Sequence, residues 1–192
     1  MKRYWKYIKP YLPAFICGPL LMIVEVIGEV LLPKFMANII NIGAANQDVP
    51  YIITMGIVMV VTALLMMAGG IGGAYFAAKA AISFAADIRK DTFEKVQKFS
   101  FANLDQYNTG SLVTRLTNDV TQVQNLINMA LRMMLRAPGM LIGALIMAFM
   151  MNRELAAVIL VVIPILVILI GIVIKTAFPR FTIMQKKLDT LN

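Results

Sequence analysis

Two acidic residues, Glu25 and Glu29, are the side chains whose type and position most directly suggest chemistry. They stand four residues apart, so on a helix they share one face. Both fall inside an apolar stretch of about residues 12–42, where a carboxylate is costly and usually faces a cavity or a partner. We predict that they line a path for cationic substrates or form a gate that responds to protonation. The alternative is that Glu29, with Lys34 nearby, lies close to the outer membrane surface and is hydrated.

The sequence lacks the residues that disulfide, metal, catalytic-triad and phosphate-binding sites require. The sequence has no histidine and one cysteine, Cys17, which excludes a disulfide framework or a Cys/His metal site within one chain. No Ser/His/Asp set is present, and no GxxxxGK[ST] motif occurs that could cradle phosphates. We therefore expect no catalytic, cofactor-binding or metal site, and no ATPase site, in this chain.

The elements that must position the two acids are helices within a membrane. Apolar residues make up 60% of the chain and its mean hydropathy is +0.78, well above a typical soluble domain. A spanning helix needs about 20 mostly apolar residues. Four stretches qualify: about 12–42, 52–86, 130–151 and 155–174. The sequence predicts an all-α membrane protein with four spans and both termini on one side.

The positive charges assign that side to the cytosol. Sixteen of the eighteen Lys and Arg residues fall on the side of the termini and the central segment, and only Lys34 and Arg153 fall on the other. Cytosolic segments of membrane proteins carry such an excess. This distribution accounts for the net charge of +8 without nucleic acid. The basic and aromatic N-terminus is typical of an anchor at the cytosolic membrane surface.

Two of the helices are predicted to extend far beyond the bilayer. An uninterrupted helix over residues 50–104 would be about 80 Å long, against about 30 Å for a bilayer core. The third helix carries a 3-4-3-4-3 apolar seam, and Asp119 with Gln122 fits a capping box at its start. Its seam residues are Val120, Val123, Ile127, Ala130, Met134 and Ala137. We expect residues 87–129 to form a cytosolic helical hairpin.

The tip of this hairpin has the features of a docking element. In residues 109–118, Gly110 relieves the backbone at the start of a short helix, and Leu112, Val113 and Leu116 give it an apolar face. Arg115 lies beside that face and could pair with a partner's acids or locally with Asp119. An apolar patch so far from lipid favours a protein partner. The alternative is a solvated loop whose apolar residues pack on the hairpin itself.

Small residues on the second span predict close helix packing. Gly69, Gly73, Ala77 and Ala81 recur every four residues and allow another helix to approach.

The chain resembles the N-terminal half of an ABC exporter transmembrane domain of the bacterial multidrug and lipid type. The resemblance covers essentially the whole sequence. It rests on these segments: LLPKFMANIINIGA (31–44), DIRKDTFEKVQKFS (87–100), YNTGSLVTRLTNDVTQVQ (107–124) and IPILVILIGIVIKTAFPRFTIMQKKLDTLN (163–192). The segment 107–124 is similar to the first coupling helix, which implies that Gly110, Leu112, Val113, Arg115 and Leu116 contact a nucleotide-binding domain.

Length is where the chain departs from that family. The type IV exporter fold has six spans followed by a nucleotide-binding domain, whereas this sequence has four spans. We expect a truncated or partial subunit, with ATP and Mg²⁺ bound by a nucleotide-binding domain outside these residues.

The resemblance implies a transmembrane portion of an ATP-driven exporter in the bacterial plasma membrane, with both termini cytosolic. It implies alternating access, amphipathic drugs or lipids as substrates, contact with membrane lipid, and a second identical or different subunit. The alternative is a helical membrane protein without transport activity, such as a regulator or a channel-like oligomer.

Overall fold

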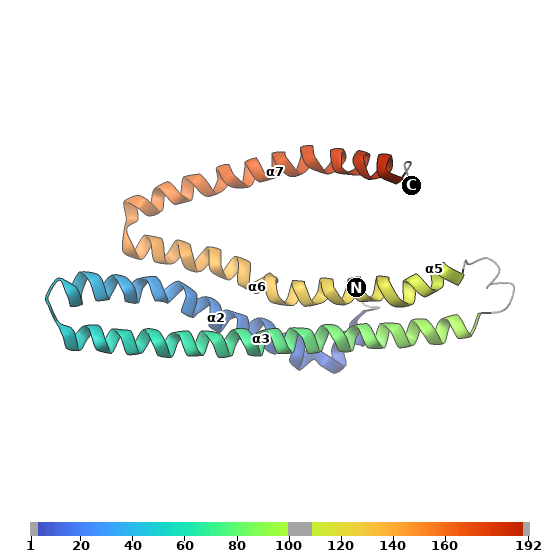
Figure 1. Ribbon diagram of the computed structural model, residues 1–192, viewed down its shortest axis with the longest axis horizontal. Helices are drawn as coiled ribbons and strands as arrows, with labels where there is room; N and C mark the ends of the chain where they lie inside the picture. Colours follow the sequence, from blue (N-terminus) through green and yellow to red (C-terminus); the bar gives the residue numbers. More distant parts are fainter. Residues whose placement is uncertain (1–3, 100–108, 190–192) are drawn as a thin grey trace. The chain divides into compact units, whose positions relative to one another are not determined.

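The computed structural model describes residues 4–99 and 109–189, and its regular elements are helical (Figure 1). Two compact units, residues 1–143 and 144–192, are described separately below. The elements in chain order are α1 (Trp5–Ile8), η1 (Lys9–Tyr11), α2 (Leu12–Asn38), η2 (Ile39–Ala44), α3 (Val49–Gln97), α5 (Thr109–Thr114), η3 (Arg115–Asp119), α6 (Val120–Met151) and α7 (Arg153–Asp189).

Four helical segments are long and apolar enough to cross a membrane. They are Trp5–Ala44, Val49–Gln97, Gly110–Met151 and Ala156–Phe181. The prediction of an all-α protein with four spans is therefore confirmed, and the chain is a multi-pass membrane protein.

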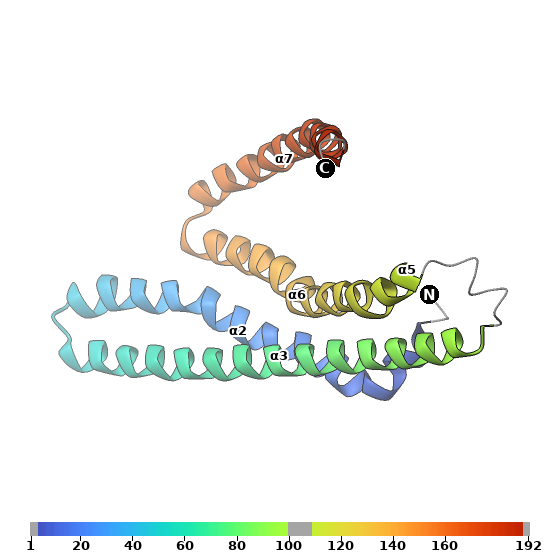
Figure 2. The same cartoon turned by 45° about the vertical axis from the view of Figure 1, so that its right-hand side comes forward.

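Helices α2 and α3 lie side by side and antiparallel, as both views show (Figure 2). The turn between them is short because η2 continues the first helix to Ala44. Gln47 takes a positive φ of 54°, and the Asp48 carboxylate then caps α3 by accepting a hydrogen bond from the Tyr51 amide at 3.0 Å. The predicted break at residues 43–50 is thus shorter, with its chain reversal confined to residues 45–48.

The predicted ridge of small residues is the contact between α2 and α3. Gly69 and Gly73 are buried, and Ala77 and Ala81 are 0% and 1% exposed. A Cβ atom placed on Gly73 would lie 3.1 Å from the Gly18 carbonyl oxygen, so backbone meets backbone here. Met22 of α2 packs over the ridge and is 1% exposed. The ridge therefore sets the separation of the two helices, as predicted.

Helix α3 extends well beyond a bilayer thickness but ends earlier than predicted. Its 49 residues span about 74 Å at about 1.5 Å per residue. The predicted continuation through Leu104 is wrong from Lys98 onward, because the Lys98 and Phe99 amides bond to carbonyls three residues back, at Lys95 and Val96. These bonds tighten the last turn and close the helix. Leu104 itself lies outside the described residues.

The third long helix has no separate start at Asp119. Helix α5 passes through the π-helical η3 directly into α6, so Asp119 is inside a helix and the predicted capping box is wrong. The predicted seam is packed only in part within this unit, since Val120 is 5% exposed whereas Val123 is 37% and Met134 is 66% exposed. A Cβ on Gly139 would lie 3.4 Å from Val26 of α2, and one on Gly143 would lie 2.9 Å from Val30. Small residues on a neighbouring face therefore make the contact with α2.

The second unit contains the end of α6 and all of α7. Asn152 alone separates the two helices, and its side-chain oxygen accepts a hydrogen bond from the Glu154 amide at 2.9 Å. Helix α7 has 37 residues with Pro164 and Pro179 inside it, so its backbone continues beyond the predicted span of about residues 155–174.

Candidate functional site

The two predicted acids share one arginine of the third long helix. Nη1 of Arg136 lies 3.0 Å from Oε1 of Glu25, and Nη2 lies 3.3 Å from Oε2 of Glu29. Glu25 and Glu29 lie one helical turn apart on α2, which places both carboxylates within reach of one guanidinium. The sequence prediction of a common face is confirmed, and the arrangement ties α2 to α6 within the first unit.

Glu25 is the more enclosed member of this acid–arginine cluster. Its side chain is 19% exposed, against 37% for Glu29 and 36% for Arg136. A Cβ on Gly70 of α3 would lie 3.2 Å from the Glu25 carboxylate, so the absence of a side chain there makes room for the acid. Oε2 of Glu25 is buried and makes no hydrogen bond to any described residue.

The cluster lies deep along the helices from the predicted outer turns. At about 1.5 Å per residue, Glu29 lies about 22 Å from Ala44, and Arg136 lies about 24 Å from Asn152. Glu29 is paired with Arg136 and is 37% exposed, so both the substrate-path prediction and the alternative of a hydrated Glu29 stay open. Two carboxylates beside one guanidinium give the cluster a formal net charge of −1.

A recess of about 500 Å³ adjoins the cluster on the α6 side. Arg136 forms one edge, Met22 of α2 another, and amides and methionines of α6 complete it. The lining residues are Met22, Asn125, Asn128, Met129, Arg132, Met133 and Arg136. Flexible methionines beside polar groups can adapt to amphipathic molecules of different shape. The recess thus offers both apolar surface and fixed charges.

The predicted docking residues do not all face outward. Val113 is 54% exposed, and Gly110 and Arg115 are exposed. Leu112 is only 8% exposed and Leu116 is half-buried. The prediction of an exposed apolar face is therefore wrong for Leu112, because that side chain packs inward, as the alternative from the sequence proposed. Arg115 forms no ion pair with Asp119 in the described part of the chain.

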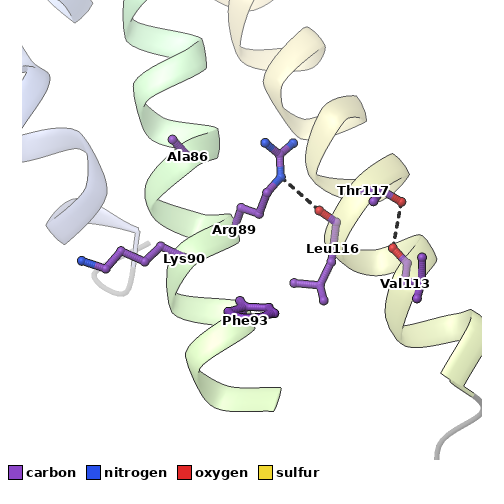
Figure 3. Close-up of a pocket in the computed structure, with 7 residues that line it drawn as sticks. All are labelled: Ala86, Arg89, Lys90, Phe93, Val113, Leu116 and Thr117. Atoms are coloured by element: carbon purple, nitrogen blue, oxygen red, sulfur yellow. Dashed lines mark hydrogen bonds between the residues drawn. The ribbon is translucent and has the colours of Figure 1, made fainter. Parts of the chain in front are cut away.

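An apolar groove of about 550 Å³ separates the predicted docking segment, residues 109–118, from α3 (Figure 3). Its walls are Phe93 and Ala86 on α3, and Val113 and Leu116 on the facing segment. Nε of Arg89 bridges the groove and donates a hydrogen bond to the Leu116 carbonyl oxygen at 3.1 Å. This bond connects the docking segment directly to the long helix α3.

The N-terminal segment is attached to the same part of α3. Lys6 forms an ion pair with Asp91, and the Tyr7 hydroxyl donates to the same carboxylate at 2.7 Å. The Tyr7 ring packs edge-on against Phe84, with 5.9 Å between ring centroids. The hydrogen bonds from Lys6 and then Tyr7 lower the pKa of Asp91. The predicted surface anchor therefore also binds the helical extension.

Two arginines in these contacts were not recognised as site residues from the sequence. Arg136 was counted only as a positive charge at the start of the third span, and Arg89 only as a charge of the central segment. A signal for Arg136 existed, because two unpaired acids on one buried helix face need a cation from another helix. Nothing in the sequence pattern marks Arg89.

Comparison with known proteins defines the class. Residues 15–192 match the family described as the ABC transporter transmembrane region, and this chain belongs to that family. It is 38% identical over its whole length to the uncharacterized ABC transporter ATP-binding protein YfiB of Bacillus subtilis, covering 34% of that protein.

The alignments with more distant relatives cover similar shares of this chain and of the relative. The chain is 30% identical to the uncharacterized ABC transporter ATP-binding protein Rv1273c of Mycobacterium tuberculosis, with 97% of the chain and 32% of the relative covered. It is 23% identical to the ATP-dependent lipid A-core flippase of Vibrio parahaemolyticus, with 99% and 32% covered. The chain thus spans about a third of the length of these relatives. The expected ABC exporter transmembrane fold agrees with this family and with the four long helices.

Proposed function

We propose that this chain is the membrane-spanning portion of an ATP-driven exporter subunit in a bacterial plasma membrane. It moves amphipathic drugs or lipids by alternating access, together with a second subunit and a nucleotide-binding domain that holds ATP and Mg²⁺. The names of its relatives, which include ATP-binding proteins and a lipid flippase, support the class of activity. The excess of Lys and Arg on the side of the termini supports a cytosolic position for both ends.

The observation that carries the proposal is the exposed segment at the tip of the long helical hairpin. Helix α3 is about 74 Å long, more than twice the thickness of a bilayer core, so its far end must project from the membrane. There the chain turns into α5 and η3, where Val113 and Arg115 are exposed. The exposed Val113 and Arg115 and the half-buried Leu116 lie on one short helical segment outside lipid, where they offer a surface to a folded protein domain.

A photo-crosslinking amino acid at position 113 tests this docking in the complete transporter. We expect crosslinks to the nucleotide-binding domain when Val113 is replaced, because its side chain points outward. The same replacement at Gln122, which is also exposed but about 13 Å further along the helix, serves as the control. Crosslinking that is equal at both positions, or absent at 113, would refute docking through this segment.

The acid–arginine cluster supports a preference for cationic amphiphiles. The cluster adjoins a recess lined by methionines and by Arg132 and Arg136, and Glu25 has one buried oxygen without a partner among the described residues. We propose that Glu25 and Glu29 form part of the substrate path or its gate. A substrate cation or a proton would then compete with Arg136 for the carboxylates.

Transport assays that compare a cationic substrate with a neutral one test this path. Glu25→Gln removes the excess negative charge and keeps the side-chain shape, so uptake of a cationic dye into inverted vesicles should fall several-fold while uptake of a neutral dye changes little. Glu94→Gln on the exposed extension of α3 is the matched control. Equal loss of both dyes would assign Glu25 to folding, and no loss would remove it from the path.

A further inference from the structure

The π-helical segment η3 leaves one backbone carbonyl without its ordinary helical partner. In an α-helix the Leu116 carbonyl would accept a hydrogen bond from the amide of Val120, four residues on. Here the Val120 amide bonds to the Thr117 carbonyl, three residues back. Such irregular turns occur mostly as short insertions and are frequent at functional sites.

Arg89 of α3 supplies a donor to this carbonyl. Its Nε lies 3.1 Å from the Leu116 oxygen, across the groove described above (Figure 3). The donor is charged, and bonds of that kind are stronger than those between neutral groups. The neighbouring residue Lys90 also lines the groove, but its side chain extends away from Leu116.

Three threonines weaken the regular hydrogen-bond ladder around the same segment. The hydroxyls of Thr114, Thr117 and Thr121 donate to the carbonyls of Gly110, Val113 and Thr117 at 2.8–2.9 Å. Hydroxyl groups that bond back to the preceding turn in this way often bend helices. In the part of the chain that the structure describes, the Arg89 side chain of α3 bonds to the backbone of this same segment.

We infer that Arg89 is a positioning residue for coupling to the motor, which is the nucleotide-binding domain. It acts through its hydrogen bond to the Leu116 carbonyl, which fixes the register of η3. This inference rests on the proposed function, because it assumes that the exposed face at Val113 meets the motor. One residue on a helix corresponds to about 100° of rotation. If η3 changed from π to α geometry, the docking face would turn by that amount relative to α6. Arg89 holds the register in which α5 presents Val113 outward, and it transmits motion of that segment to α3.

The test measures transported substrate per ATP hydrolysed by the complete transporter in proteoliposomes. Arg89→Met removes the donor and keeps most of the side-chain volume. Arg89→Lys keeps a charged donor, and Lys90→Met makes the same loss of charge one residue away. We expect the transport-to-hydrolysis ratio to fall about two- to tenfold in Arg89→Met, the range set by the net free energy of one hydrogen bond. Arg89→Lys should restore part of it, and Lys90→Met should match the wild type.

A second variant addresses η3 itself. Deletion of Asn118 removes the residue by which the π segment exceeds an α-helix, so the helix can close with α-helical bonds while α5 keeps nearly the same orientation. We expect this variant to couple ATP hydrolysis to transport and to be independent of Arg89, so that adding Arg89→Met causes no further fall in the transport ratio. Hydrogen exchange of peptides that cover residues 113–121 should rise in Arg89→Met and stay unchanged in Lys90→Met.

The outcomes separate this inference from the proposed function. A wild-type ratio and wild-type exchange in Arg89→Met would overturn the role of Arg89, even if Val113→Asp uncouples the transporter. A wild-type ratio in Val113→Asp would instead overturn the proposed docking. If Arg89→Met does not assemble, the same substitution combined with the Asn118 deletion decides: a reduced ratio or failed assembly of that double variant overturns control by the register of η3.

Discussion

Replacing Gly69 by alanine should push α2 and α3 apart. A Cβ atom at this position would lie 3.0 Å from the Leu21 carbonyl oxygen and 3.3 Å from the Glu25 amide nitrogen. Both neighbours are backbone atoms, so no side chain can rotate away to relieve the contact. On the same helix, Gly56 has nothing within 4 Å of the corresponding Cβ position. Gly56→Ala is therefore a control with identical chemistry.

The expected difference follows from two opposing effects. Alanine is favoured over glycine inside a helix by about 1 kcal/mol, and both variants gain this amount. Overpacking against rigid neighbours costs about 1–3 kcal/mol, and only Gly69→Ala meets that cost. Gly69→Ala should therefore be less stable than Gly56→Ala by about 1–3 kcal/mol. For a chain of this size, each kcal/mol corresponds to about 2–4 °C in Tm.

Thermal unfolding in mild detergent, followed by tryptophan fluorescence and by loss of monodisperse protein, measures this difference. Gly56→Ala should unfold slightly above the wild-type temperature, and Gly69→Ala should unfold several degrees below Gly56→Ala. Equal transition temperatures for the two variants would refute the close backbone approach of α2 and α3.

Three further predictions concern individual contacts. Arg136→Met leaves two carboxylates without a cation and should lower the free energy of unfolding by about 1–3 kcal/mol, a value kept small because the three side chains are partly exposed. Adding Glu25→Gln to this variant should recover part of the lost Tm. Met22→Ala opens a cavity at a side chain that is 1% exposed and should lower stability by about 2–4 kcal/mol, measured by the same unfolding assay. Asp91→Asn should expose the N-terminus to trypsin cleavage after Lys6. Because the pKa of Asp91 lies below its usual value of 3.8, the contribution of Asp91 is present above that pH and is lost only as the pH falls through the lowered pKa, so the ratio of cleavage in Asp91→Asn to cleavage in the wild type should not vary between pH 5 and pH 8.

The spans were predictable because hydrophobic length is a property of the sequence alone. Four apolar runs, a ridge of glycine and alanine at every fourth position, and the turn at Asn152 all follow from local patterns. The common face of Glu25 and Glu29 also follows from helical periodicity. These features need no knowledge of which helix meets which.

The remaining features depend on contacts between distant residues. The pairing of Arg136 with Glu25 joins positions more than 100 residues apart, and no periodicity encodes it. No local pattern marks the burial of Leu112 or the π geometry of η3, whereas the sequence suggested an exposed leucine and a helix start at Asp119. Local capping signals give way when a helix can continue with tertiary support.

The central claim is that the exposed segment around Val113 couples a motor to the membrane helices. The most direct measurement is the ratio of substrate transported to ATP hydrolysed by the complete transporter carrying Val113→Asp, with Gln122→Asp as the charge-matched control. We predict that Val113→Asp keeps ATP hydrolysis, loses most of its transport and assembles normally, because the exposed side chain tolerates a charge in the folded chain but not against an apolar partner surface. A wild-type ratio in Val113→Asp, or an equal loss in Gln122→Asp, would contradict the claim.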